Sequence, residues 1–296
     1  MVYLIDASVY VFRAYFSVPP DMRDGQGNPV HALYGFARFL GDLLERARPE
    51  YVAVAFDGSL MTSFRNRIYP RYKANREPAP PDLQLQFERC RELCEHYGVA
   101  WFSSPEYEAD DIIGTLATRA REEGLRSTVV TRDKDMAQLI REGDVYWDYA
   151  GNTRYFYRDI AERFGVQPER YADYLALTGD AVDNIPGVPG IGPKTAAVLM
   201  RTFESLDDLY ARLDVVNDLP LRGAASVAAR LAQHREAAYL ARQLTGIHCA
   251  MPLTTGRHDL RRRSPDCDRF DRFCDAQGFG LLLRRQVQRL GVGAGL

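Results

Sequence analysis

The sequence has 296 residues, 46% of them hydrophobic, which is enough for one large domain or two modest ones with buried cores. Its formal net charge is −2, so the chain is not basic as a whole, and any surface that binds nucleic acid must be local. The five cysteines are scattered, and none has a histidine at zinc-finger spacing. No apolar run reaches membrane-spanning length, and Asp6 and Arg13 interrupt the apolar start as no signal peptide would allow. We therefore expect a cytoplasmic protein with reduced thiols rather than a secreted or membrane protein.

Short β-rich runs alternate with helical patterns in the first half of the chain. Strands are expected at 2–6, 51–57, 99–102, 127–133 and 144–149, and helices at 33–47, 84–97, 109–123 and 135–142. This alternation is typical of a mainly parallel sheet that helices cover on both faces.

The second half, from about Tyr157, has helical patterns and no convincing strand. The helices are expected at 158–165, 168–178, 193–203, 223–244 and 267–290, and the charged stretch 257–266 is expected to be a surface linker. The architecture predicted from these patterns is an α/β domain followed by a helical one.

Aspartates stand at the ends of several predicted strands. Asp6 ends the first strand, Asp57 ends the second, and Asp133 and Asp135 follow the fourth. A single aspartate at such a place is usually a turn former. Because ligands of open parallel sheets bind outside the carboxyl ends of the strands, the repetition favours one acidic crevice instead.

The stretch "PEYEADDIIG" (105–114) adds Glu106, Glu108, Asp110 and Asp111 to the first turn of a predicted helix. Favourable interaction with the helix dipole is the simpler explanation for acids there. It does not explain the aspartates at the strand ends, and so many carboxylates in one crevice would repel each other unless cations neutralised them. Cysteine and histidine are absent from these positions, so the pattern predicts Mg²⁺ or Mn²⁺, with two ions about 4 Å apart acting on a phosphodiester.

A basic and aromatic stretch follows Asp57. Between residues 60 and 77 five basic side chains are interleaved with three aromatic ones: Arg65, Arg67, Arg71, Lys73 and Arg76, with Phe64, Tyr69 and Tyr72. A solvated helix is the alternative. The mixture also suits a surface that follows a phosphate backbone and stacks on bases, which is the interpretation we favour.

The second half opens with "LTGDAVDNIPGVPGIGPKTA" (177–196). Its glycine turn leads into a helix with Pro193 at the first position, where backbone N–H groups and Lys194 can hold a phosphate. Asp180 and Asp183 precede the turn and are spaced to share a helical face. Only three of the 38 basic residues are lysines (Lys73, Lys134 and Lys194), which suggests that these positions need a compact ammonium group.

Six segments, taken together, resemble a known family. In order they are "LIDASVYVFRAYF", "VAFDG", "SFRNRIYPRYKANR", "EYEADDIIG", "VTRDKDMAQL" and "LTGDAVDNIPGVPGIGPKTA". The order is that of bacterial and phage 5′→3′ exonucleases, the flap-endonuclease-like 5′-nucleases that include the N-terminal exonuclease domain of DNA polymerase I. The resemblance extends from residue 1 to about 290. It fits the stand-alone form, although a truncated chain would look the same.

The resemblance implies an α/β fold with a PIN-like, mainly parallel sheet flanked by helices, followed by a helical domain with a helix–three-turn–helix element that binds DNA. The implied domains are a catalytic domain at 1–160 with a helical arch at about 60–82, a DNA-binding domain at 161–258, and C-terminal helices at 259–296. The implied metal ligands are Asp6, Asp57, Glu108, Asp110, Asp111, Asp133, Asp135, Asp180 and Asp183. The implied catalytic residues are Lys73, Arg76, Asp6 and Asp57, and the implied DNA contacts are Phe64, Arg65, Tyr72, Lys73, Arg76, Gly187, Gly190, Gly192, Lys194 and Thr195.

In this family pattern Glu106 matches no ligand position, and Tyr72 is the residue expected to stack on a base. The implied activity is a structure-specific 5′→3′ exonuclease or flap endonuclease that uses two or more Mg²⁺ ions, for which Mn²⁺ can substitute, with K⁺ at the helix–three-turn–helix. The implied partner is DNA with 5′ flaps, nicks or 5′ ends, and a monomeric bacterial protein is expected. The alternatives are a catalytically silent flap- or junction-binding protein and a PIN-like single-strand ribonuclease.

Overall fold

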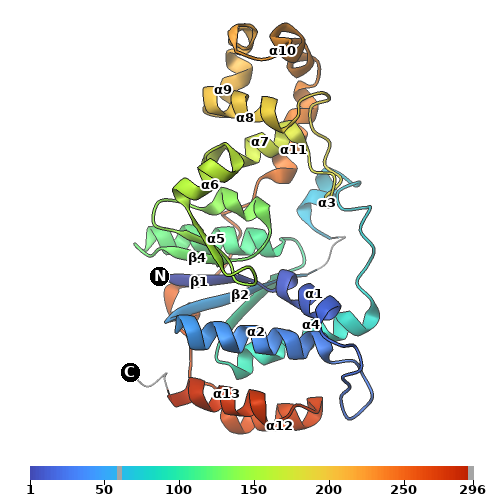
Figure 1. The fold of residues 1–296 in the computed structure, drawn as a ribbon, viewed down its shortest axis with the longest axis vertical. Coiled ribbons are helices and arrows are strands. Elements are labelled where there is room, and N and C mark those ends of the chain that lie inside the picture. The colour runs from blue at the N-terminus through green and yellow to red at the C-terminus, as the bar shows by residue number, and fades with distance from the viewer. Residues whose placement is uncertain (59–61, 293–296) are drawn as a thin grey trace. The chain divides into compact units, whose positions relative to one another are not determined.

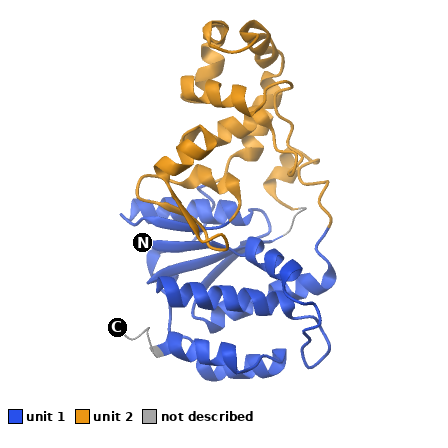
Figure 2. Cartoon of the chain, viewed as in Figure 1, with its two compact units in different colours: residues 1–58, 78–131, 249–296 blue, residues 59–77, 132–248 orange. Residues whose placement is uncertain are grey.

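The computed structural model describes residues 1–58 and 62–292 (Figure 1). Leu60 and Met61 of the predicted arch and residues 293–296 of the predicted C-terminal region lie outside the described residues. The chain forms two compact units (Figure 2). Unit 1 comprises residues 1–58, 78–131 and 249–296, and unit 2 comprises residues 59–77 and 132–248.

Unit 1 is built on parallel strands. They are β1 (Val2–Asp6), β2 (Tyr51–Asp57), β3 (Ala100–Ser104) and β4 (Ser127–Val130). Within the unit their order is β3-β2-β1-β4, with every pairing parallel and with Asp6 of β1 opposite Ala55 of β2. The first six residues of β2 are buried, as expected of a strand that is covered on both faces.

Helices cover both faces of this sheet. Figure 1 shows α5 (Ala109–Glu122) on one face, and α2 (His31–Ala47) with α4 (Pro81–His96) on the other. The unit also contains α1 (Ala7–Ser17), the 3₁₀ turn η4 (Arg257–Leu260), α12 (Cys267–Gln277) and α13 (Leu281–Val292). Helix α13 packs against α2, where Gly41 leaves room for Gln286, and the Arg289 guanidinium donates to Glu45 at 2.6 Å.

Unit 2 is largely helical. Its elements are α3 (Phe64–Ile68), η1 (Lys134–Leu139), the antiparallel hairpin of β5 (Val145–Asp148) and β6 (Thr153–Phe156), α6 (Tyr157–Phe164), η2 (Pro168–Arg170), α7 (Tyr171–Thr178), α8 (Pro193–Thr202), α9 (Leu206–Ala211), η3 (Leu213–Asp218), α10 (Ala224–Gln233) and α11 (Arg235–Thr245). Helix α7 packs against both α8 and α11, so it forms the centre of the helical part.

The predicted fold class, a mainly parallel α/β fold followed by a helical domain, is confirmed. The predicted type or bounds of several individual elements were wrong. The helix expected at 135–142 is the 3₁₀ turn η1, which ends at Leu139, and the strand expected at 127–133 ends at Val130. The helix expected at 223–244 is broken at His234, and the one at 267–290 is broken after Gln277, where Gly278 adopts φ +68°.

The elements that the sequence did not indicate include α1, β6, α9, η3 and η4. Helix α1 follows β1 without a loop and is apolar on most sides, so its sequence continues the apolar pattern of the strand. The predicted domain boundaries stay predictions, because the compact units are assembled from segments that are distant in sequence. Within residues 1–58 and 62–292, no helix combines the length and apolar character needed to cross a membrane.

Candidate metal and phosphate site

The two strand-end aspartates of unit 1 accept hydrogen bonds from neutral donors. Asp6 is 4% exposed, and its carboxylate accepts a hydrogen bond from the Thr131 hydroxyl at 2.8 Å. The Asp57 carboxylate accepts from the Ser8 hydroxyl at 2.6 Å and from the Ala109 backbone N–H at 2.9 Å. Because Ala109 is the first residue of α5, the end of β2 is tied to the beginning of that helix.

The acids of "EYEADD" organise the same helix end. Glu108 is the N-cap of α5, and its backbone N–H donates to the buried Asp111 carboxylate at 3.1 Å. Asp110 accepts from the Asp111 N–H at 2.8 Å. Placing all four acids in the first turn was wrong for Glu106 and Glu108. The Ser104 hydroxyl accepts from the backbone N–H groups of residues 106 and 107, which makes a bend and delays the beginning of the helix.

Four further acids lie within unit 2. The Asp133 carboxylate accepts from the Asp135 N–H at 2.9 Å at the beginning of η1. The Asp180 carboxylate accepts from the Val182 N–H at 2.8 Å, and two backbone hydrogen bonds join residues 180 and 185. The expectation that Asp180 and Asp183 share a helical face was wrong, because α7 ends at Thr178 and residues 180–185 form a bridged turn.

In unit 2, burial and neighbouring carboxylates disfavour the ionisation of Asp133 and Asp135. Burial, followed by the negative charge of Asp133, raises the pKa of Asp135 to about 8. Burial, with a further contribution from Asp183, also raises the pKa of Asp133. One carboxylate oxygen of Asp135, Oδ1, is buried and accepts no hydrogen bond. A buried carboxylate oxygen that accepts no hydrogen bond suits a hard divalent cation, so the side chains present fit the implied metal.

The metal ligands nevertheless remain a prediction as a set. Across the described ranges 1–58 and 62–292, no three or more His, Cys, Asp or Glu side chains are arranged so that they could hold an ion as they stand. The structure divides the nine predicted acids between the two units. Asp6, Asp57, Glu108, Asp110 and Asp111 belong to unit 1, and Asp133, Asp135, Asp180 and Asp183 belong to unit 2.

Cations accompany the acids of unit 2. The Lys73 ammonium lies 3.8 Å from Asp183, and the Arg76 guanidinium forms an ion pair with the same carboxylate. The Lys134 ammonium lies 3.3 Å from Asp180. Lys134 was not among the predicted site residues, although its position between two predicted ligands in "DKD" and the scarcity of lysine in this chain were available signals.

Two predicted DNA contacts of the arch are structural residues instead. Tyr72 is 3% exposed and packs in a cluster with Ala176, Ile185, Ala241 and Leu244, so its ring has no free face for a base. Arg65 is 1% exposed, and its guanidinium donates to the backbone carbonyl oxygens of Leu244 and Gly246 at 2.9 and 2.8 Å. Both predictions failed because a basic and aromatic composition does not distinguish a buried side chain from an exposed one.

Phe64 is half-buried, with the Arg65 guanidinium 4.6 Å from the centre of its ring and His248 at its edge. Its predicted role in DNA binding stays a prediction.

The glycine turn has a packed part and an open part. Gly187 passes so close to Gly179 that a Cβ on either residue would lie 2.4 Å from the other's backbone nitrogen, which explains Gly187 by packing. Gly190 has φ +77° and lies against Arg230, whose guanidinium is 3.4 Å from its carbonyl oxygen. Gly192 caps α8, and no atom lies within 4 Å of the place that a Cβ would occupy on it, so ligands can approach the backbone there.

Lys194 is exposed and Thr195 is half-buried in the first turn of α8. The N–H groups at the beginning of this helix point towards the open part of the turn, an arrangement that suits an anion. Arg230 was missed by the sequence analysis because it lies on α10, 40 residues from the glycine it contacts.

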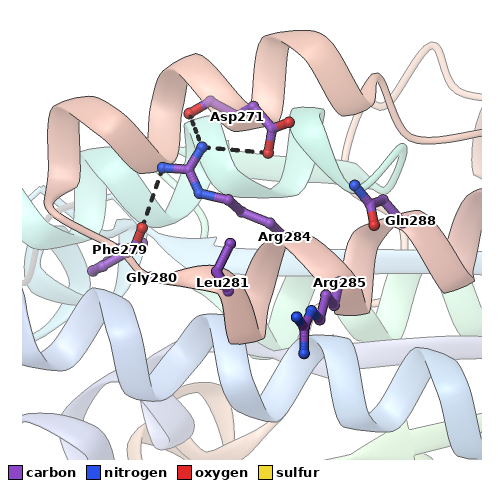
Figure 3. Close-up of a pocket in the computed structure, with 7 residues that line it drawn as sticks. All are labelled: Asp271, Phe279, Gly280, Leu281, Arg284, Arg285 and Gln288. Carbon is purple, nitrogen blue, oxygen red and sulfur yellow. Dashed lines mark hydrogen bonds and ion pairs between the residues drawn. The ribbon is translucent and has the colours of Figure 1, made fainter.

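A separate pocket lies on α12 and α13 (Figure 3). There the Arg284 guanidinium donates to the carbonyl oxygens of Asp271 and Phe279 at 3.0 and 3.2 Å, which closes one wall of the pocket. None of the predicted site residues lines it.

Comparison with known proteins agrees with this fold. Residues 1–165 match the family model of the 5′-3′ exonuclease N-terminal resolvase-like domain, and residues 166–268 match that of the 5′-3′ exonuclease C-terminal SAM fold. A 5′-3′ exonuclease of Aquifex aeolicus is 36% identical over 207 residues, which are 70% of this chain and 71% of that protein.

Longer and more distant proteins also match. The thermostable DNA polymerase I of Thermus filiformis is 37% identical over 282 residues, 95% of this chain but only 32% of the polymerase, so the chain spans about a third of that relative's length. A crystal structure of the bacteriophage T5 D15 flap endonuclease, with DNA and metal ions, has the same fold at a TM-score of 0.64 and 18% identity, over 100% of this chain and 99% of that one. The chain belongs to the 5′-3′ exonuclease family.

Proposed function

We propose that this chain is a divalent-metal-dependent, structure-specific 5′ nuclease that hydrolyses phosphodiester bonds of DNA near 5′ ends and at 5′ flaps. The observation that carries the proposal is the arrangement within unit 2. Carboxylates that suit cations and the basic side chains of Lys73 and Arg76, which suit a phosphate, meet at Asp183. A phosphodiester needs both kinds of partner, because its own charge must be neutralised before a nucleophile can approach.

Mg²⁺ is the proposed cofactor, with Mn²⁺ as a substitute, and the predicted carboxylate ligands would hold it. When bound, the cations would supply charge neutralisation and the activation of a water molecule. Asp135 contributes a carboxylate oxygen that no protein donor already occupies. The potassium ion implied at the glycine turn stays a prediction.

The other steps belong to the chain itself. Lys73 and Arg76 bind the phosphate to be cleaved, since both place a positive charge beside the acids. The beginning of α8, with Gly192, Lys194 and Thr195, would bind the backbone of the duplex portion without reading its sequence. DNA accompanies the T5 flap endonuclease in its crystal structure, which supports DNA as the partner of this chain.

The two alternative functions are less well supported. A catalytically silent binding protein would not need four carboxylates in unit 2, two of them with raised pKa values. A PIN-like single-strand ribonuclease would not need a glycine turn that opens the beginning of α8 to a duplex.

The test uses 5′-labelled flap, nicked, blunt and single-stranded DNA, with matched RNA strands, in Mg²⁺ and in excess EDTA. We expect cleavage at the flap junction and from nicked 5′ ends in Mg²⁺, and no cleavage in EDTA. Full cleavage in chelator would contradict the metal-dependent mechanism. Cleavage of single-stranded RNA alone would favour the ribonuclease.

A further inference from the structure

The segment that carries Lys73 and Arg76 is attached by hydrogen bonds to the acidic turn of unit 2, which is formed by residues 180–185. The Lys73 backbone N–H donates to the Asp183 carbonyl oxygen at 2.9 Å. In the opposite direction, the side-chain amide of Asn184 donates to the Arg71 carbonyl oxygen at 2.7 Å. The two bonds run between residues 71–73 and 183–184, so they fix the register of one segment on the other.

A second asparagine extends this attachment. The Asn75 amide lies 3.2 and 3.3 Å from the carbonyl oxygens of Ala181 and Val182. Beneath it the ring of Tyr72 is buried in the cluster that contains Ile185, the residue that closes the acidic turn. The segment is therefore attached on its polar side by amides and on its apolar side by a buried ring.

The backbone at this attachment is unusual. Lys73 has φ +53° and Asn184 has φ +56°, both in the left-handed region. Asparagine enters this region at low cost, whereas lysine does so only where its surroundings impose it. The bonds from residues 71–75 to the turn are what impose it here, and the result directs the Lys73 ammonium to within 3.8 Å of Asp183.

We infer that Asn184 is a positioning residue for the reaction: through Arg71 it holds Lys73 and Arg76 in register with Asp180 and Asp183, with support from Asn75. The inference rests on the proposed function for the consequence of this register, but the attachment itself can be measured without any cleavage. Asn184 acts through the two basic residues and does not itself contact the phosphate.

The chain supplies a matched control. Asn152 also has a left-handed backbone, with φ +50°, and lies exposed in the hairpin between β5 and β6. Replacing either asparagine by glycine keeps the left-handed backbone without strain and removes only the side chain. An effect of Asn184→Gly that Asn152→Gly lacks therefore comes from the amide bond to Arg71, and not from the shape of a turn.

The experiment measures amide exchange of the peptide covering residues 69–77, single-turnover cleavage of a flap in Mg²⁺, and flap affinity in Ca²⁺. For Asn184→Gly we expect faster amide exchange and an unchanged flap Kd. Cleavage should be slower by about 10- to 100-fold, since a displacement of ~1 Å can cost on the order of 10²-fold in rate. Asn152→Gly should match the wild type in all three. In a Lys73→Met background, Asn184→Gly should have a much smaller effect on the rate, because the residue that it positions is gone.

The outcomes separate the inference from the function on which it rests. Unchanged exchange, or unchanged cleavage, in Asn184→Gly would overturn the positioning role. Fully additive effects of Asn184→Gly and Lys73→Met would overturn it as well. Wild-type protein that cleaves none of the DNA substrates, together with faster exchange in Asn184→Gly, would overturn the proposed function and leave the attachment established.

Discussion

The acids of the two units are compensated in different ways. In unit 1, hydroxyl and backbone N–H groups donate to Asp6, Asp57 and Asp111. In unit 2, ion pairs with Lys73, Arg76 and Lys134 accompany Asp183 and Asp180, and Asp135 has a buried oxygen without a donor. Neutral donors fix the direction of a carboxylate and leave its charge, whereas cations offset the charge.

This difference distinguishes acids that contribute to the proposed cleavage of DNA mainly by holding the fold from acids that contribute mainly through their charge. The unit 1 acids are part of how β2 and α5 are joined, so changing them should disturb the fold as well as the function. In unit 2, Asp133 and Asp135 are held at an electrostatic cost, which their raised pKa values express, so changing either should reduce function without weakening the fold.

The largest expected effect tests this separation with two conservative variants. Asp135→Asn should lower turnover by about 10²- to 10³-fold or more, the usual effect of losing one electrostatic contact to a transition state, while flap affinity in Ca²⁺ and melting temperature do not fall. Asp57→Asn should lower turnover and also the melting temperature, because Ser8 and Ala109 donate to different oxygens of Asp57 and an amide has an NH₂ group in place of one of them. Equal losses of melting temperature in the two variants would remove the distinction between the units.

The second prediction concerns the shape of a cation in unit 2. The Lys73 side chain is 11% exposed, and its ammonium lies between Asp183 and the ring of Tyr72. A planar guanidinium is wider, so Lys73→Arg should slow single-turnover cleavage by roughly one to two decades with little change in flap affinity. Arg76→Lys is the companion variant, since Arg76 is more exposed and should tolerate the exchange better. A Lys73→Arg enzyme that cleaves at the wild-type rate would show that only charge matters at this position.

The third prediction concerns compensation by Lys134. Removing this cation from Asp180 leaves the unit 2 acids more negative, so Lys134→Met should tighten Mn²⁺ binding by roughly fivefold, as a charge pair with one solvated member is worth on the order of 1 kcal/mol. Titration calorimetry or electron paramagnetic resonance would measure it. Arg132→Met is the control, because Arg132 pairs with Asp148, which is not one of the predicted metal ligands. Weaker Mn²⁺ binding in Lys134→Met would mean that Lys134 chiefly orients the Asp180 carboxylate and does not compete with Mn²⁺ for it.

The smallest expected effect is on stability in chelator as a function of pH. The pKa of Asp135 is about 8 in the folded chain and 3.8 for an unperturbed aspartate, so folding favours its protonated form. The wild type therefore loses stability as pH rises from about 4 to 8. Asp135→Asn lacks this loss, so its melting temperature should equal that of the wild type near pH 4 and exceed it increasingly as pH rises towards 8. A constant difference across this range would show that the charge of Asp135 is already compensated.

The fold class was predictable because it depends on periodicity and on chain direction, whereas the convergence of all nine acids on one site stays a prediction. Parallel strands place their carboxyl ends at one edge, so Asp6 and Asp57 could be related from their positions alone. The break at His234 and the 3₁₀ form of η1 were not predictable, because local hydrogen bonding decided between helical patterns of similar periodicity.

The roles of the basic residues depended on burial, which composition does not encode. Arg65 and Arg76 have the same side chain 11 residues apart in one segment, yet one guanidinium is buried on the carbonyl oxygens of Leu244 and Gly246 and the other is partly exposed beside Asp183. The partner that buries Arg65 lies 179 residues away in sequence. No local pattern could have indicated it.

The discontinuity of unit 1 has a consequence for biosynthesis. Its sheet is made from the first 131 residues, but α12 and α13, which pack on α4 and α2, come only after the whole helical insertion at 132–248. A nascent chain emerging from the ribosome would expose the side of α2 that α13 covers, including Gly41, until α13 (Leu281–Val292) had been translated. Closing so long an intervening loop is slow, which makes this stage the one at which a chaperone would have most to protect.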